Sequence, residues 1–257
     1  AYQLLNQPIT IIMANGERWT PSNFDGTFGG KVTLREALKM SINVVAVRVL
    51  QELAPINQVI DYAHKMGITT DIPPYESIAL GTAEVIPLQL TSAYGVFAND
   101  GIYVEPVAIL RIEDRFGNVI EEAKPEKRVV ISPETAYIIT DILEDAVNSG
   151  TGTRVRQFFH LPCAGKTGTT RKMVEGKGYG QDVICTFVGF FPADSPLVAA
   201  IIVIDEPKKN KWASQTTAPL FSELIKTVAL HMNIPPADQP FATLLNIGAR
   251  GKETWMQ

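Results

Sequence analysis

Apolar residues recur at helical spacing in six stretches of the chain, and most of these stretches carry recognisable end signals. The first begins at a Thr33-Leu34-Arg35-Glu36 capping box, in which the hydroxyl and the carboxylate satisfy the first free amides. It is interrupted after Leu38 by Ser41-Ile42-Asn43, whose polar side chains compete for backbone hydrogen bonds. Five further helices are predicted: Val44 to Leu53, the stretch between Pro55 and Gly67, Pro87 to Ala98, Ser132-Pro133 to Gly150, and Ala218 to His231.

The second half of the chain carries strand-like patterns. Val107 to Glu113 and Asn118 to Glu122 flank the turn residues Phe116-Gly117-Asn118, which predicts a surface hairpin. Three longer apolar runs predict consecutive strands, at Leu161 to Thr169, Val183 to Phe191 and Leu197 to Asp205. A loop punctuated by glycines from Gly176 to Gly180 is expected to join the first two.

This order of elements favours an α+β fold, with an antiparallel sheet flanked by helices. A doubly wound parallel sheet needs a helix between successive strands, and the connections here are short or broken by glycine. Residues 1–235 are expected to belong to one domain, and residues 236–257 to form a polar C-terminal tail.

Composition and charge exclude several functions. A net charge of −4 and a pI near 5.5 leave no basic surplus to neutralise phosphates, so we expect no nucleic-acid partner. The histidines are scattered, and Cys163 and Cys185 have neither a metal-ligand spacing nor that of a disulfide framework. We therefore predict no metal site, no cofactor and no Ser-His-Asp triad. No apolar run reaches the roughly 18 residues of a membrane-spanning helix.

Lys166-Thr167-Gly168-Thr169 falls on the first of the three predicted strands. Side chains alternate along a strand, so Lys166 and Gly168 share one direction, and Thr167 and Thr169 share the other. Sheet twist and a bend at Gly168 would still bring the ammonium and both hydroxyls towards one anion. The missing side chain at Gly168 would let a substrate backbone lie along the strand edge. The alternative is a structural edge strand with a snorkelling lysine and solvated threonines.

Ser41-Ile42-Asn43 falls at the turn between two apolar helices. Such a turn projects both polar side chains from a rigid support, as a functional site requires. Ser41 would pass protons, and Asn43 would hold an amide through its two donors and its carbonyl. The alternative is a simple helix kink or cap. Cys163-x-x-Lys166 offers no competing nucleophile, because a spacing of three on a strand points the two side chains to opposite faces.

These two motifs, Ser-x-Asn and Lys-Thr-Gly, occur together in the penicilloyl-serine transferases, and further segments extend the likeness. Over about residues 8–235 the chain resembles the transpeptidase domain of penicillin-binding proteins, particularly the bifunctional ones. The segments that carry the resemblance are Trp19 to Gly26, Gly30 to Leu38, Ser41 to Asn43, Leu80 to Leu90, Ala98 to Gly101, Ala164 to Thr170 and Phe187 to Asp194.

The resemblance implies an acyltransferase that cross-links peptidoglycan at the extracytoplasmic face of the bacterial cytoplasmic membrane. In such enzymes a serine attacks the penultimate D-alanyl carbonyl of a stem peptide, D-alanine leaves, and an amine from a neighbouring strand resolves the acyl-enzyme. β-Lactams acylate the same serine. Stem peptides and β-lactam antibiotics are therefore the implied partners.

Carried over by motif, the catalytic positions are Ser41 as proton relay, Asn43 for the acyl amide and Lys166 for the electrostatics of the terminal carboxylate. The substrate-binding positions are Thr167, Gly168 and Thr169. The backbone N–H of Thr169 is implied as one oxyanion donor, the kind of group that stabilises developing negative charge.

The family's third motif, Ser-x-x-Lys, carries the nucleophile, and none of the nine serines in this chain is followed three positions later by a lysine. In the family that motif lies upstream of the segments matched here. The resemblance therefore implies an N-terminal segment of the same protein as a further partner, and a sheet that is incomplete on its N-terminal side. This chain alone is expected to be inactive.

Two other functions stay open. A serine β-lactamase or penicillin sensor of related fold shares the Lys-Thr-Gly motif. A non-catalytic peptidoglycan-binding module would account for the missing nucleophile.

Overall fold

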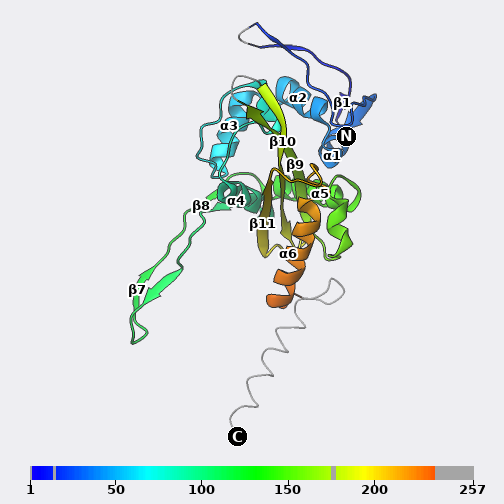
Figure 1. The fold of residues 1–257 in the computed structure, drawn as a ribbon. Helices are drawn as coiled ribbons and strands as arrows, with labels where there is room; N and C mark the ends of the chain where they lie inside the picture. The colour runs from blue at the N-terminus through cyan, green and yellow to red at the C-terminus, as the bar shows by residue number, and fades with distance from the viewer. Residues whose placement is uncertain (1, 14–15, 175–177, 235–257) are drawn as a thin grey trace.

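The computed structural model describes residues 2–13, 16–174 and 178–234 (Figure 1). Its α-helices are α1 (Leu34–Met40), α2 (Asn43–Glu52), α3 (Ile56–Lys65), α4 (Pro87–Ala98), α5 (Pro133–Ser149) and α6 (Thr217–His231), and its 3-10 helices are η1 (Glu76–Leu80) and η2 (Thr153–Gln157). Its strands are β1 (Gln3–Leu5), β2 (Ile11–Ile12), β3 (Arg18–Trp19), β4 (Lys31–Thr33), β5 (Ile102–Val104), β6 (Arg111–Glu113), β7 (Val119–Glu122), β8 (Lys127–Val129), β9 (Ala164–Val174), β10 (Gly178–Phe191) and β11 (Val198–Asp205). None of the helices described is long and apolar enough to cross a membrane.

The central sheet is antiparallel and has the strand order β11-β10-β9. Phe187 of β10 lies opposite Thr167 of β9 and Ile202 of β11. The register between β10 and β9 shifts between Tyr179 and Val183, which marks a bulge near the start of β10 and the end of β9. Within the described ranges no further strand pairs with β9 or β11, so both are edge strands there.

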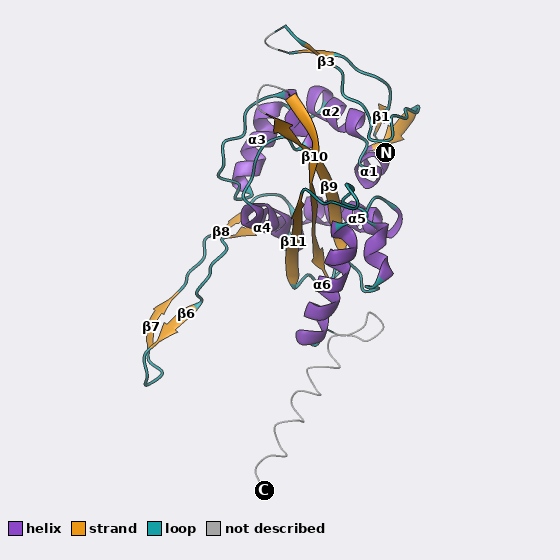
Figure 2. Ribbon diagram, in the orientation of Figure 1, coloured by secondary structure: helices purple, strands orange, loops and turns teal. Residues whose placement is uncertain are grey.

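Helices cover both faces of this sheet (Figure 2). On one face, Phe187 of β10 packs against Phe221 of α6, with their ring centroids 4.5 Å apart. On the other face, Phe190 packs with Leu143 of α5, and Tyr94 of α4 joins the same cluster. The middle strand is therefore buried on both faces, and the α+β fold predicted from the sequence is confirmed.

The six predicted helices are all present, and their end signals act as expected. The Thr33 hydroxyl accepts a hydrogen bond from the Glu36 N–H at 3.1 Å, at the start of α1. The Ser132 hydroxyl likewise accepts from the Thr135 N–H at 3.2 Å, and Pro133 occupies the first turn of α5. The interruption at residues 41–43 separates α1 from α2 as predicted.

The first two long strands extend further into the predicted glycine loop than expected, while β9 begins at Ala164 and not at Leu161. β9 continues beyond Thr169 to Val174, and β10 begins at Gly178 instead of Val183. Part of the predicted glycine loop therefore belongs to a strand, while Gly176 lies outside the described residues. Backbone pairing of Gly178 with Val174 in the antiparallel ladder outweighs the low strand propensity of glycine.

Other differences concern short elements. The predicted hairpin forms, but its strands cover only β6 and β7, and residues 107–110 lie outside them. The two-stranded pairs β1–β4, β2–β3 and β5–β8 were not predicted, because strands of two or three residues are too short to show alternation. The predicted tail, residues 236–257, lies outside the described residues.

The β6–β7 hairpin projects from the body of the molecule and is anchored at its base (Figure 1). Arg128 of β8 lies 4.0 Å from the ring centroid of Tyr103 in β5, and its Nε donates to the Lys65 carbonyl at 2.9 Å. Gly67 also packs against the Tyr103 ring. Its φ is +95°, and a Cβ added to it would lie 2.2 Å from that ring. The end of α3 and the base of the hairpin are thus locked around a position that only glycine fits.

Replacing Gly67 with alanine is expected to destabilise the protein by about 2–5 kcal/mol, because a left-handed alanine is strained and its methyl group overlaps Tyr103. Gly81 is a matched control, since its φ is +74° but nothing lies within 4 Å of an added Cβ. Gly81→Ala should therefore carry only the backbone strain, about 1–2 kcal/mol. Urea denaturation followed by circular dichroism measures both losses. Equal losses would show that the Tyr103 ring moves aside without cost.

Candidate active site

Ser41 stands where α1 ends, in a left-handed backbone conformation with φ 58° and ψ 48°. Its N–H donates to the Leu38 carbonyl at 3.2 Å, and the Ile42 N–H donates to the Ala37 carbonyl at 2.9 Å. This conformation costs a residue with a side chain about 1–2 kcal/mol, so the turn is strained. Asn43 is the first residue of α2, and both Ser41 and Asn43 are half-buried. The turn therefore presents both polar side chains at a helix junction, as predicted.

A distant segment holds the start of α2 in place. The Asn43 Nδ2 donates to the Ser22 carbonyl at 3.1 Å, and the next residue along, Asn23, is buried. Asn23 accepts from the Val44 N–H at 3.1 Å and donates to the Asn6 Oδ1 at 2.6 Å. The Val44 amide is one of the helix-start donors that have no partner inside the helix, so Asn23 caps α2 from outside it.

The β9 register places the residues of the second motif on two faces of the strand. Lys166 and Gly168 share one face with their cross-strand partners, and the two threonines share the other. The pairs are Lys166 with Val188, Gly168 with Thr186, Thr167 with Phe187, and Thr169 with Cys185. The predicted alternation is confirmed.

Lys166 is held in a poorly solvated place. Its Nζ donates to the Thr167 carbonyl at 3.2 Å, and in the described part of the chain no carboxylate forms an ion pair with it. Burial penalises the ammonium and lowers the pKa of Lys166 to about 8. A bound anion would supply the counter-charge and favour the protonated form.

Packing between β9 and β10 explains the glycine at position 168, which the sequence did not suggest. A Cβ at this position would lie 2.4 Å from the Thr186 Oγ1, so the space beside Gly168 is already filled by a side chain of β10. The same hydroxyl donates to the Gly168 carbonyl at 3.4 Å, a weak contact. Close packing between the strands therefore requires glycine here, and passage of a substrate backbone along this edge stays a prediction.

Both threonine hydroxyls of the motif have protein partners. The Thr167 Oγ1 lies 2.8 Å from the Thr151 Oγ1, and the Thr169 Oγ1 accepts from the Ala213 N–H at 3.1 Å. A hydroxyl has one donor and two acceptor positions. Thr169 therefore keeps its proton for another acceptor while its oxygen is held by the backbone at Ala213.

The helix that carries Ser41 is clamped to α5. Arg35 of α1 forms ion pairs with Asp141 and with Asp145, the second at 2.5 Å between Nη1 and Oδ2. These hydrogen bonds raise the pKa of Arg35 further above its usual range. All three side chains are partly solvated, so the clamp contributes geometry more than stability.

Thr151 joins the two motifs directly. It follows the end of α5, where its N–H points to the Lys39 carbonyl at 3.4 Å, two residues before Ser41. Its hydroxyl meets Thr167 in β9. One residue therefore contacts both the helix that ends in Ser41 and the strand that carries Lys166, which brings the two motifs to one place.

An aromatic contact connects the motifs on another side. The rings of Phe24 and Trp212 lie 4.1 Å apart between centroids and meet at 86°, an edge-to-face arrangement. Phe24 follows the segment that holds Asn43, and Trp212 precedes the Ala213 amide that binds Thr169. Both rings are partly exposed, at 63% and 41%. The site is thus bordered by contacts from Thr151 on one side and from this aromatic pair on another.

These bordering residues stand in no pattern that predicts a contact with the motifs. Thr151 lies between Gly150 and Gly152, a pattern that predicted only the end of a helix. Asn23 falls in a turn-rich segment without periodicity, and the contact of Trp212 depends on a residue far away in the chain.

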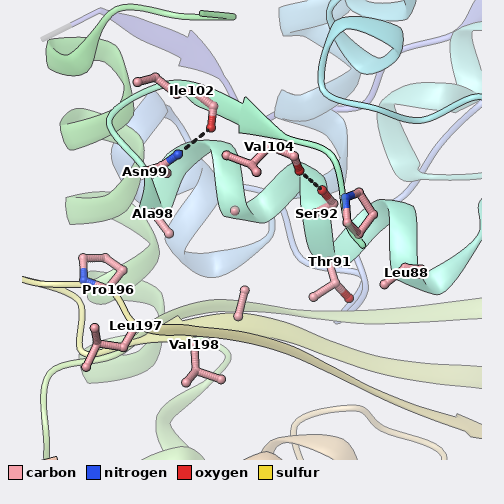
Figure 3. Close-up of a pocket in the computed structure, with 13 residues that line it drawn as sticks. Leu88, Thr91, Ser92, Ala98, Asn99, Ile102, Val104, Pro196, Leu197 and Val198 are labelled. Atoms are coloured by element: carbon pink, nitrogen blue, oxygen red, sulfur yellow. Dashed lines mark hydrogen bonds between the residues drawn. The ribbon is translucent and has the colours of Figure 1, made fainter. Parts of the chain in front are cut away.

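Two hollows lie away from both motifs. One of about 420 Å³ lies between α4, β5 and the start of β11 (Figure 3), where the Ser92 hydroxyl donates to the Val104 carbonyl and the Asn99 amide donates to the Ile102 carbonyl. The other, of about 400 Å³, lies between α3 and α4 and is largely apolar. Neither is lined by a motif residue, and the candidate site is placed instead along the edge strand β9.

The described residues offer neither a cluster of metal ligands nor a reactive cysteine. No group of three or more His, Cys, Asp and Glu side chains gathers there to hold a metal ion. Cys163 and Cys185 are free and buried, and burial raises the pKa of the Cys163 thiol to about 12. This thiol is therefore protonated at neutral pH and is no nucleophile.

Comparison with curated proteins finds penicillin-binding proteins 1A among the relatives of this chain. Penicillin-binding protein 1A of Aquifex aeolicus is 39% identical over 219 residues, which cover 84% of this chain and 28% of that protein. Penicillin-binding protein 1A of Clostridium acetobutylicum is 33% identical over 231 residues, covering 88% of this chain and 27% of that protein. The chain therefore spans less than a third of the length of these relatives.

Solved structures share the fold. Penicillin-binding protein 1A from Haemophilus influenzae has a TM-score of 0.75 at 24% identity, over 93% of this chain and 39% of that one. Penicillin binding protein 3 from Mycobacterium tuberculosis, in a complex with aztreonam, has a TM-score of 0.76 at 24% identity, over 92% of this chain and 58% of that one.

The penicillin binding protein transpeptidase domain family matches residues 7–226, a range that includes both motifs. Since this match takes in most of the chain, the chain belongs to the family of penicillin binding protein transpeptidase domains.

Proposed function

We propose that this chain carries most of the active site of a serine-type peptidoglycan D,D-transpeptidase, which transfers an acyl group from D-Ala-D-Ala stem peptides. The observation that carries the proposal is the meeting of the Ser41 turn and the Lys166 strand through Thr151. Two elements far apart in sequence are thereby directed to one strand edge, where an extended peptide can pair with backbone groups. Family membership agrees with this chemistry.

In this proposal, Lys166 and the two threonines recognise the terminal carboxylate. The ammonium is poorly solvated, so an anion that approaches it meets a strong, weakly screened charge. Thr167 and Thr169 donate hydroxyl protons to the same anion. The backbone N–H of Thr169 serves as one oxyanion donor, and Gly168 lets the strand bend towards the ligand.

Ser41 and Asn43 act on the reacting end of the substrate. Ser41 relays a proton between the nucleophile and the leaving amine, a role that its fixed left-handed backbone supports. Asn43 holds the acyl amide, and its side chain is already oriented by the Ser22 carbonyl. Pre-organised groups of this kind lower the barrier because they need not reorganise during the reaction.

The nucleophile in this proposal comes from a segment outside the chain. None of the nine serines has a lysine three positions later, and a serine hydroxyl without an adjacent base is a weak nucleophile. We further propose that residues 1–235 form the larger, C-terminal part of the transpeptidase domain. The complete protein would work at the extracytoplasmic face of the bacterial cytoplasmic membrane and would be acylated by β-lactams.

The 257-residue chain by itself should form no covalent adduct with penicillin, because no serine in it has an activating lysine. Mass spectrometry of the intact chain after incubation with penicillin measures this. The full-length protein is the control and should gain the mass of one β-lactam, in an adduct that persists. A penicillin adduct on the isolated chain would place the nucleophile within these residues, and rapid turnover of the full-length adduct would indicate a β-lactamase.

Replacing Lys166 with alanine in the full-length protein should slow acylation by about 10²–10³-fold, as the loss of one charged transition-state donor typically does. Folding should be little affected, because the side chain has no ion-pair partner in the described residues. Lys166→Arg should restore only part of the rate, since a planar guanidinium presents its charge differently. The second-order acylation rate and a thermal melt are measured together. A rate within about threefold of the parent would make Lys166 a structural residue.

The acylation rate should also fall as pH rises through about 8, the lowered pKa of Lys166. Below that value the ammonium is charged and attracts the substrate carboxylate; above it the amine is neutral and the attraction is lost. The pH dependence of the second-order rate reports the pKa values of the free enzyme, so the rate should decrease with rising pH around this value. The Lys166→Arg variant should keep its activity to higher pH. A decrease near the ordinary lysine pKa of about 10.4 would contradict the assignment.

A further inference from the structure

Thr151 lies in a short loop that packs closely against its neighbours. Gly150 before it is so close to α1 that a Cβ there would lie 2.5 Å from the Lys39 carbonyl oxygen. Gly152 after it donates its N–H to the Ala146 carbonyl at 2.9 Å, and a Cβ on Gly152 would lie 3.3 Å from the Phe187 ring. The two glycines let the loop pack against both α1 and β10. The backbone of Thr151 is therefore fixed relative to the strand that carries Thr167.

This placement controls a single hydroxyl proton. The oxygens of Thr151 and Thr167 are 2.8 Å apart and share one hydrogen bond, in which either residue can be the donor. When Thr167 donates to Thr151, the Thr167 hydroxyl has no proton left to donate to a ligand. When Thr151 donates, the Thr167 proton is left free for a second acceptor. A carboxylate is an acceptor only, so a bound carboxylate selects the second arrangement.

The neighbouring charge makes the proton direction important. Lys166 and Thr167 leave β9 on opposite faces, but the Lys166 Nζ reaches back to the Thr167 backbone carbonyl and donates to it at 3.2 Å. The ammonium therefore lies against residue 167, and in the proposed function an anion bound to it is also bound by the Thr167 hydroxyl. A hydroxyl that presents its lone pairs would repel this anion, whereas one that presents its proton would bind it. Hydrogen bonds to charged groups are among the strong ones, so the difference is large enough to measure.

We infer that Thr151 is a positioning residue that turns the Thr167 hydroxyl into a donor for the terminal carboxylate of the substrate. The inference rests on the proposed function, because it needs a carboxylate ligand at the β9 edge. Thr151 touches no substrate atom in this account. It acts through Thr167, and it connects that hydroxyl to the helix that ends in Ser41.

The test uses the full-length protein and the second-order rate of acylation by a penicillin with a free carboxylate and by its methyl ester. Thr151→Val keeps the shape of the side chain but removes the hydroxyl. We expect a loss of about tenfold or more with the free carboxylate, and a change of less than about twofold with the ester. Thr151→Ser keeps the hydroxyl and should stay near the parent. Thr153→Val, at the exposed first residue of η2, is the matched control and should match the parent.

A double-mutant cycle with Thr167→Val supplies a second readout. If Thr151 acts through Thr167, then Thr151→Val should cause no further loss in the Thr167→Val background. Losses that multiply, equal losses with acid and ester, or a Thr151→Val rate equal to the parent would each overturn the inference. Thr151→Ala replaces Thr151→Val if the valine variant does not fold. A parent protein that penicillin does not acylate would instead refute the proposed function, which separates the two failures.

Discussion

Three phenylalanines on β10 hold the two cores of the protein together. Phe187 and Phe191 belong to the cluster under α6, and Phe190 belongs to the cluster under α4 and α5. A slip of β10 by one residue would move every one of these rings to the wrong face, so burial on both faces fixes the strand register. Because β9 pairs with β10, the position of β10 also determines the register of β9. The directions of Lys166 and Thr167 are consequently set by packing several ångströms away from the site.

The candidate site adds converging loops to this fixed strand. The Ser41 turn comes from α1, the Thr151 loop from the end of α5, and the Ala213 amide from the segment before α6. Each of these segments adjoins a helix that is packed on the sheet or clamped to a packed helix. A site assembled in this way can keep strained groups, such as the left-handed Ser41, because the surrounding structure determines their conformation.

Sequence reasoning located the parts that depend on local chemistry. Capping residues such as Thr33 and Ser132 marked helix starts correctly, because they bond to amides three residues away. The alternation at Lys166 followed from strand geometry alone. The short strand pairs and the start of β10 at Gly178 could not be predicted, since backbone pairing with a partner strand creates them.

The bordering contacts of the site were invisible for the same reason. Asn23 caps a helix to which it does not belong, and Thr151 meets Thr167 only after α5 has packed on the sheet. Neither residue stands in a periodic pattern or in the Ser-x-Asn or Lys-Thr-Gly motif. A sequence motif shows which chemical groups are present. The residues that orient those groups come into contact with them only in the tertiary fold.

The clamp between α1 and α5 has a consequence for the order in which the chain folds. Arg35 binds partners 106 and 110 residues further along, so the clamp closes a long loop. Long-range contacts of this kind form late, after the locally capped helices. At translation speeds of about 5–20 residues per second, the turn that bears Ser41 waits on the order of ten seconds for α5 to be synthesised. Throughout that interval α1 can already pack on β1 and α2, but Arg35 has no carboxylate partner from α5 to fix the end of the helix that bears Ser41.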